Sequence, residues 1–489
     1  MRSLNERSCK TLTELPSSLL METHTDVLVV GARCAGSAAA IALARRGRAV
    51  VALDGATFPS DTLSTHLFFP HHWAELERLG ARDRVLALDP PLHPRAALGT
   101  PEVEITGRYG AYEGIATGSC VRRPGLDLAL VETARAAGAE VREATRVTDL
   151  LHDDDGRVVG VRWKDREDRT GEIRAKLVVG ADGRRSTVAR LVGTREHHRW
   201  ENQRMMAFAY YDDPREELRG VAAQWREGRE LATVFPCDGG KSVVLLMPPV
   251  ERAEEFRRDA TGAFSSTVAA IAPLAERLRG CTMASKVRTS RSHPSYFRHS
   301  QGPGWALAGD AGHFKDPVTA QGIRDALRFG RLLGEAVAPY LDDPADLDAA
   351  LARWESDRDE QCLPMYQWAN GLGRDDDVSP LERASYRWFA ASEDRATELW
   401  DVFSRRRPPT QVFRPTRLLG WVRDCVRDPA VDRAELWRVL RRDVGREIAR
   451  VREARGFVQN REESARRGLT PATASPERAP ALIAPEAGA

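Results

Sequence analysis

The chain has 489 residues, of which 42% are apolar and 29% charged, and its 73 lysines and arginines nearly balance 71 aspartates and glutamates. This composition excludes a disordered chain, and the near-neutral charge argues against nucleic acid as the main partner. No apolar run reaches the roughly 18 residues of a membrane span, so we expect none. The seven cysteines lack a CxxC pair, which is typical of reduced thiols in the cytoplasm and predicts neither disulfides nor a metal site.

The elements predicted in chain order begin with a strand, a helix and a second strand. Residues 26–30 are a β-branched apolar run, residues 37–46 are alanine-rich, and residues 49–53 are a second apolar run that ends at Asp54. Such runs are typical of buried parallel strands, so we predict a βαβ unit. A helix and three strands are predicted to follow, over 127–137, 139–142, 158–163 and 173–179.

The pattern changes after residue 200. Three apolar runs predict the strands of an antiparallel sheet, over 206–211, 232–235 and 242–247. A short buried strand is predicted over 305–308, followed by a long helix over 321–337. Residues 346–458 are helical and arginine-rich, and the Ala/Pro-rich sequence after about residue 460 is typical of disorder. Residues 60–115 are not assigned.

A phosphate-binding turn is predicted between the first strand and its helix. Residues 31–36 read GARCAG, which matches GxGxxG except at Arg33. Gly31 permits the tight turn, Gly36 lets the helix pack closely, and the helix N-terminus offers N–H groups to a pyrophosphate. We expect Arg33 to fold over the pyrophosphate and to add a charged hydrogen bond. Asp54 is placed to bind ribose hydroxyls, which favours FAD or NAD over NADP.

Two further glycine motifs follow predicted strands. Residues 179–186 read VGADGRRS, and residues 309–322 read GDAGHFKDPVTAQG and open the long helix. A helix N-terminus in this position stabilises the negative charge of a reduced flavin. Pro317 suits the first turn of that helix, because a first-turn residue does not use its N–H. Each motif alone is a glycine-rich turn, but all three in this order indicate one nucleotide cofactor.

With these motifs, residues 26–345 resemble the FAD-dependent monooxygenases of the para-hydroxybenzoate hydroxylase type, with geranylgeranyl reductases and flavin halogenases as more distant relatives. The resemblance implies an α/β fold: a Rossmann-like FAD-binding domain, an inserted antiparallel-sheet substrate domain and a helical C-terminal region. The predicted domains are an N-terminal extension (1–22), the FAD-binding domain in two parts (23–199 and 286–345), the substrate domain (200–285), the helical region (346–460) and a disordered tail (461–489).

The resemblance also implies which residues bind FAD. Carried over by position, the family's contacts fall on Gly31, Gly36, Asp54, Asp182, Gly183, Gly309, Asp310, Pro317 and Gly322. Arg123 lies three residues before Leu126 and matches a family arginine, with Arg122 as the close alternative. Ala320 departs from the family, which often has glycine at that position.

A flavin alone does not fix the reaction, so several functions stay open. We favour a monooxygenase that uses NAD(P)H and O2 on an aromatic or otherwise apolar small molecule in a bacterial pathway. A reductase of the geranylgeranyl type is the alternative, because residues 235–236 keep the Phe-Pro of that group. A halogenase is disfavoured, since residues 31–163 contain no lysine and no WxWxIP segment exists. A non-catalytic FAD-binding sensor is the alternative of another class.

No side chain is an obvious catalyst, and the candidates lie in the third motif. Lys315 would stabilise a reduced flavin or an anionic substrate, although a solvated surface lysine is an equal alternative. His313 and Pro317 are expected to shape the flavin site. His66, His71 and His72 are further proton-handling candidates, and for His71 and His72 a packed or surface position is the simpler interpretation. The arginines of 405–417 favour a solvated helix face over an anionic membrane contact. The sequence leaves the oligomeric state open.

Overall fold

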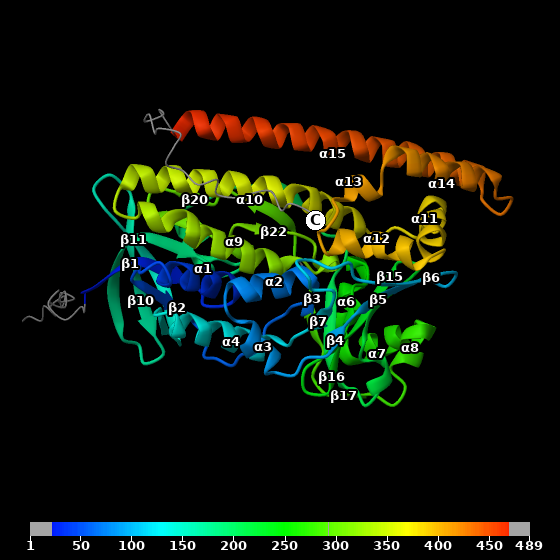
Figure 1. The fold of residues 1–489 in the computed structure, drawn as a ribbon, viewed down its shortest axis with the longest axis horizontal. Helices are drawn as coiled ribbons and strands as arrows, with labels where there is room; N and C mark the ends of the chain where they lie inside the picture. The colour runs from blue at the N-terminus through cyan, green and yellow to red at the C-terminus, as the bar shows by residue number, and fades with distance from the viewer. Residues whose placement is uncertain (1–21, 292, 469–489) are drawn as a thin grey trace, which may run out of the picture.

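The fold is built on a parallel sheet (Figure 1). The computed structural model describes residues 22–291 and 293–468, so nearly all of the predicted N-terminal extension lies outside the described residues. The parallel strands are β1 (Glu22–Val30), β2 (Val50–Leu53), β8 (Glu140–Arg142), β11 (Thr170–Gly180) and β21 (Trp305–Leu307). Their order is β21-β11-β1-β2-β8, which places β1 and the turn that follows it at the centre of the sheet.

The two faces of this sheet are covered differently, and the alternation of β1 accounts for this. Val27 and Val29 face helices α1 (Cys34–Ala44), α4 (Arg123–Ala136) and α9 (Gly322–Val337). Leu28 and Val30 face the other side. That side is covered by β9 (Thr145–His152), β10 (Val158–Asp165) and α5 (Thr187–Leu191). Because successive strand residues point to opposite faces, one apolar run serves both cores.

Helices α1 and α9 pack closely because small residues face each other. A Cβ on Gly330 would lie 2.4 Å from the Ala35 carbonyl oxygen, and one on Gly334 would lie 2.8 Å from the Ala42 Cβ. Both helices begin beside the carboxyl ends of the sheet strands. Their N-termini therefore open toward the same space.

A second, mainly antiparallel sheet contains the strands of the stretch that the sequence assigns to a substrate domain. Its strands are β17 (Thr282–Met283), β13 (Met206–Asp212), β16 (Lys241–Leu246), β15 (Glu230–Cys237), β14 (Val221–Glu227), β5 (Arg95–Gly99), β6 (Glu104–Arg108) and β18 (Arg288–Ser290). The three strands predicted over 206–247 are confirmed to within two residues. The predicted division assigned 95–108 to the FAD-binding domain, but β5 pairs in parallel with β14 and extends this sheet.

The two faces of β13 have different neighbours. Phe208 faces the core that this sheet shares with the C-terminal helices, whereas Ala207 and Ala209 face a separate core. The helices α6 (Ala253–Arg258), α7 (Ala260–Ala270) and α8 (Ala272–Arg277) contribute to that separate core.

Short elements complete the first two thirds of the chain. Two small sheets consist of β3 (Leu67–Phe68), β7 (Gly118–Cys120) and β4 (Leu92–His93), and of β12 (Glu196–Trp200), β19 (Ser295–Arg298) and β22 (His313–Phe314). The other elements are β20 (Gln301–Gly302), α2 (Pro70–Arg78), α3 (Arg82–Leu86) and the 3₁₀ turns Glu216–Leu218, Val250–Arg252, Gly309–Ala311, Pro317–Thr319 and Ala338–Tyr340.

The predicted helical region is confirmed. Its helices are α10 (Pro344–Leu372), α11 (Pro380–Ala390), α12 (Glu393–Phe403), α13 (Pro409–Val412), α14 (Pro415–Arg427) and α15 (Arg433–Gly468). Helix α15 lies along one edge of the molecule (Figure 1) and runs past the boundary predicted at residue 460. The rest of the predicted tail lies outside the described residues. No helix in the described part of the chain is long and apolar enough to cross a membrane.

Candidate cofactor and substrate site

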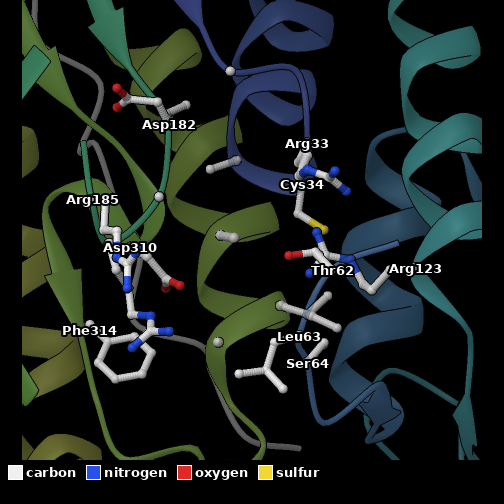
Figure 2. A pocket seen from close by; sticks show the side chains of 18 of the residues that line it. Arg33, Cys34, Thr62, Leu63, Ser64, Arg123, Asp182, Arg185, Asp310 and Phe314 are labelled. Atoms are coloured by element: carbon white, nitrogen blue, oxygen red, sulfur yellow. The ribbon is translucent and has the colours of Figure 1, made fainter. Parts of the chain in front are cut away.

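All three glycine motifs line one cavity of about 590 Å³ (Figure 2), which we call the cofactor cavity. It lies where β1, β2 and β11 end. Residues that line it include Gly31, Arg33, Asp54, Arg123, Asp182, Gly183, Asp310, Lys315, Pro317 and Gly322. The structure therefore brings together motifs that are separated by almost 300 residues in the sequence.

The first motif forms a turn in which glycine is required at two positions. Gly31 has a φ of +96°, and a Cβ on it would lie 2.5 Å from the Ala181 carbonyl oxygen. A Cβ on Gly36 would lie 1.8 Å from the Gly31 carbonyl oxygen. Helix α1 then begins at Cys34, and no side chain caps its N-terminus. The N–H groups of its first turn are available to an anion in the cavity.

Arg33 and Arg123 share one buried carboxylate. Arg123 donates hydrogen bonds of 2.8–3.0 Å to both oxygens of Asp127, and Arg33 also forms an ion pair with Asp127. A further bond of 2.9 Å joins the Arg33 guanidinium to the Ser60 hydroxyl. Both arginines are thus held in place at the cavity wall, because rigid partners restrict their rotamers. If Arg33 also binds a pyrophosphate, as the sequence predicts, it must donate the N–H groups that Asp127 and Ser60 do not use.

Asp54 fixes the turn of the first motif through hydrogen bonds to backbone N–H groups. One carboxylate oxygen accepts a hydrogen bond of 2.8 Å from the Ala32 N–H, and the other accepts one of 2.8 Å from the Ala56 N–H. Each carboxylate oxygen can accept two hydrogen bonds. Asp54 can therefore hold this loop and still accept ribose hydroxyls, as the sequence predicts.

The second motif places another carboxylate at the cavity. One oxygen of Asp182 accepts from the Thr187 N–H at 2.6 Å, while the other is buried without a hydrogen-bond partner among the described residues. Burial raises the pKa of Asp182, against hydrogen bonds that lower it. Gly183 follows with a φ of +78°, a backbone conformation that favours glycine. An unsatisfied buried oxygen beside a cavity indicates a ligand that donates hydrogen bonds.

The third motif places Asp310 on the wall of the cavity opposite Arg33 and Arg123 (Figure 2). Gly309 has a φ of +61°, and a Cβ there would lie 2.7 Å from the Ala35 Cβ. Burial raises the pKa of Asp310, while Arg184 and Lys315 act in the opposite direction. Within the described part of the chain its carboxylate forms no hydrogen bond. It is thus free to accept hydrogen bonds from the hydroxyls of a polyol such as the ribityl chain.

The end of helix α9 carries a buried cluster of charges. Asp325 forms ion pairs with Lys315, with Arg324 at 3.1 Å and with Arg405 at 2.9 Å. Burial alone would raise the pKa of Asp325, but these three cations together hold it well below its usual range. Three cations surround the single Asp325 carboxylate, so the cluster keeps positive groups where the helix N-terminus already places positive charge. Both effects favour an anionic ligand at Gly322.

Lys315 is buried, with 4% of its surface exposed, so the solvated alternative is wrong. Its ion pair with Asp325 supplies the compensation that a buried ammonium needs. His313 is also buried and packs on the Phe297 ring at 4.9 Å, outside the set of residues that line the cavity. Burial lowers its pKa well below the usual range, which keeps it neutral.

Pro317 lies at the cavity but not in the first turn of α9, which corrects the sequence prediction. It opens a separate 3₁₀ turn over Pro317–Thr319. Ala320 follows with a φ of +52°, and this left-handed backbone conformation separates that turn from helix α9. Glycine would adopt this φ without strain, which is consistent with the glycine that the family resemblance predicts at this position.

The other histidine candidates are buried, and for His71 and His72 this agrees with the packed position that the sequence favours. His71 and His72 are buried on α2, and burial lowers the pKa of His72 to about 3. His66 is buried beside the cavity, and its Nε2 lies 2.8 Å from the Tyr210 hydroxyl. The Tyr210 hydroxyl also lies 3.3 Å from Asp61. Tyr210 therefore ties down both ends of residues 62–65, which line the cavity.

A second, apolar slot adjoins the cofactor cavity, with Thr65, Pro317 and Ala320 in both walls. The slot encloses about 30 Å³ between the antiparallel sheet and α12. It is lined by Thr65, Leu67, Phe69, Ala96, Ala97, Tyr109, Ala222, Gln224, Thr233, Phe235, Leu245, Met247, Pro317, Val318, Thr319, Ala320, Trp400 and Phe403. None of these side chains is charged at neutral pH.

Sequence reasoning missed Asp127, Asp325 and the wall that α12 adds to the slot. It also placed Arg405 on a solvated helix face, although the Arg405 side chain is only 10% exposed. Asp127 had a weak signal, because it lies four residues after Arg123 on a helix and so shares its face. Arg405 had none, since it belongs to the C-terminal region and reaches α9 only through the tertiary fold. Its backbone has a φ of +55°, and its guanidinium also donates to the Gln321 side chain at 2.9 Å.

The cavity residues fit FAD. Two helix N-termini face the space, a guanidinium pair lies at one wall, and the Asp310 carboxylate accepts no hydrogen bond from any residue that the structure describes. A phosphate anion, a polyol and a ring that becomes anionic on reduction are the groups that such surfaces hold. Fold and cavity together define a dinucleotide-binding flavoprotein of the α/β class.

Comparison with known proteins agrees with this class. A family model described as "FAD binding domain" matches residues 24–364, and the chain belongs to this family. It is 31% identical over 324 residues to the menaquinone reductase of Mycolicibacterium smegmatis, across 64% of this chain and 76% of that protein. It is 27% identical over 375 residues to the digeranylgeranylglycerophospholipid reductase of Methanosarcina acetivorans, across 73% and 84%. The protein is an FAD-dependent oxidoreductase.

Among solved structures, the flavin-dependent brominase Bmp2 superposes with a TM-score of 0.67. The match covers 83% of this chain and 100% of that chain at 18% identity. At this identity the likeness shows the shared fold, which confirms the predicted α/β architecture with a Rossmann-like FAD-binding domain.

Proposed function

We propose that this oxidoreductase uses NAD(P)H to reduce a carbon–carbon double bond in an apolar small molecule. The observation that carries the proposal is the uncharged slot beside Pro317 and Ala320, next to the space that FAD would occupy. A slot of this kind selects for apolar substrates, because an unpaired charge would lose its hydration there. The 31% and 27% identity to two reductases supports reduction as the reaction.

Three unpaired donors in the slot define the substrate further. The Tyr109 hydroxyl, the Thr319 hydroxyl and the Trp400 indole N–H are buried and have no hydrogen-bond partner among the described residues. Burial also raises the pKa of Tyr109, so its hydroxyl stays protonated. Buried polar groups without partners are rare. We infer that the substrate carries a hydrogen-bond acceptor, such as a carbonyl oxygen, on an otherwise apolar body.

The chain's own groups would then have separate tasks. FAD held in this cavity and reduced by NAD(P)H would supply hydride chemistry, and the proton that balances the reduction would come from solvent. The N-terminus of α9 and the charges around Asp325 hold negative charge at the cavity. The apolar walls, including Phe69, exclude water from the reacting face. Tyr109 orients the acceptor.

Entry to the slot requires movement. A volume of about 30 Å³ admits only a water or two. The slot's walls come from separate segments, since Trp400 and Phe403 belong to α12 whereas Phe235 and Leu245 belong to the sheet. We therefore expect α12 to move away from the sheet when substrate binds. The apolar surface of the substrate would then replace the apolar contacts that α12 and the sheet lose.

Monooxygenation remains the second candidate, because the three motifs resemble that group. A phenol hydroxylase activates its substrate by removing a proton, and the slot lining has no side chain that titrates near neutral pH. The absence of a base among these lining residues favours reduction.

The test is turnover under two atmospheres. Purified holoenzyme reduced with NADPH or NADH is mixed anaerobically with a short-chain menaquinone, with geranylgeraniol or with a phenol. Reduction of a carbon–carbon double bond predicts flavin reoxidation without O2 and a product that, after any quinol is oxidised back to the quinone, has gained two hydrogens on carbon. Reoxidation that requires O2, with labelled oxygen in the product, would instead support the monooxygenase. Tight FAD binding without turnover of any substrate would favour a sensor.

A further inference from the structure

Helix α15 carries an apolar stripe on its outer face. Trp437 is 60% exposed, Val444 is 59% exposed and Ile448 is 48% exposed. Their spacing of seven and four residues places them on one side of the helix, and Val451 continues the row. Most surface helices turn such a row toward the protein core. We call these four residues the outer stripe.

The inner face of the same stretch holds the helix against the protein through apolar and charged side chains. Leu436 and Val439 are 1% and 6% exposed. Arg442 and Arg446 form ion pairs with Asp376 at 3.3 and 2.9 Å. Because this face already packs the helix on the rest of the chain, the outer stripe has no packing role among the described residues.

The charge beside the outer stripe is strongly positive. Four exposed arginines flank it, and none forms an ion pair among the described residues: Arg438, Arg441, Arg452 and Arg455. Between residues 433 and 456 the one exposed acid is Glu447, which already pairs with Arg450. Apolar side chains, a tryptophan and arginines on one face are the features of helices that lie in a membrane interface.

We propose that the outer stripe of α15 docks this protein on the surface of an anionic lipid membrane, with the helix axis in the plane of the surface. Trp437 and Ile448 would insert among the acyl chains, and the flanking arginines would bind anionic headgroups. A second copy of the chain is a poorer partner, because its own four arginines would meet these at close range. The proposal goes beyond the proposed function and does not depend on it.

The test is sedimentation of the holoenzyme with vesicles. Phosphatidylcholine vesicles with about 30 mol % phosphatidylglycerol should bind the protein, and neutral phosphatidylcholine vesicles should bind it at least about tenfold more weakly. Raising the salt concentration should release it, because exposed charges are screened. The variant Trp437→Ser/Ile448→Ser should lower binding by at least about tenfold, and so should Arg441→Glu/Arg452→Glu.

Matched control variants distinguish binding through the outer stripe from nonspecific binding of the protein to vesicles. Leu92→Ser removes a side chain that is 48% exposed on β4, and Arg84→Glu reverses an exposed charge on α3. Neither should change binding, and circular dichroism should show that all variants keep the fold. Equal binding to neutral vesicles, or equal binding of the α15 variants and the wild type, would overturn the proposal. A dimer in light scattering that Trp437→Ser/Ile448→Ser dissociates would also overturn it, since the stripe would then be a self-interface.

Discussion

The buried charge cluster at α9 makes a strong prediction for Asp325→Asn. The side chains of Asp325, Lys315 and Arg324 are only 3–4% exposed, and that of Arg405 is 10% exposed. Removing the carboxylate takes away the ion-pair partner that Lys315, Arg324 and Arg405 share. Breaking a buried ion pair by removing one partner costs about 3–5 kcal/mol. We therefore expect the variant to lose about that much stability against unfolding.

The assay is urea unfolding of the holoenzyme, followed by tryptophan and flavin fluorescence. The matched control is Asp401→Asn, because Asp401 is equally buried but pairs with Arg406 and Arg407, which are 29% and 47% exposed. Those guanidinium groups regain water, so the control should cost about 1 kcal/mol. Adding Lys315→Met to Asp325→Asn should restore part of the loss. Equal effects of the two single variants would refute the reasoning.

Three further predictions concern the cavity, the slot and acid stability. Gly36→Ala should abolish FAD binding in equilibrium dialysis, since its Cβ would lie 1.8 Å from the Gly31 carbonyl oxygen; retained binding would show that this turn is dispensable. Tyr109→Phe should raise KM by about tenfold with FAD affinity unchanged, and an unchanged KM would remove Tyr109 from the substrate site. Burial would raise the pKa of Asp213, but Arg277 and Ser242 lower it to about 2. Its stabilising effect is therefore present above its unfolded pKa of about 3.9 and is lost as the pH falls toward 2. Asp213→Asn should flatten the stability profile in that window, and an unchanged profile would contradict the assignment.

The parts that sequence reasoning predicted well are those set by local chemistry. The βαβ unit follows from β-branched runs and from the glycines at positions 31 and 36. The motif itself indicates that these two positions require glycine for the turn and for close packing. The same holds for the second and third motifs, which line one cavity. Parallel strands bring their carboxyl ends together, so motifs that follow strands converge in space.

The parts that it missed depend on distant segments. Strands β5 and β6 lie in a Pro/Gly-rich stretch that has no clear period, and their place is fixed by pairing with β14, more than 100 residues later. Arg405 reaches Asp325 across 80 residues. The slot needs the sheet and α12 together, and neither element alone shows a pocket. Pro317 was placed in the wrong turn because the left-handed Ala320 is unusual for a residue with a Cβ.

The most direct test of the proposed reaction is anaerobic reoxidation of the reduced enzyme. Holoenzyme is reduced with NAD(P)H in the absence of O2 and mixed with a quinone that carries an isoprenoid side chain, and the flavin absorbance is followed. We predict that the oxidised flavin spectrum returns at a rate that depends on substrate, and that the product, after any quinol is oxidised back to the quinone, has gained two hydrogens in its side chain. A flavin that stays reduced until O2 is admitted, with an oxygen atom then found in the product, would contradict it.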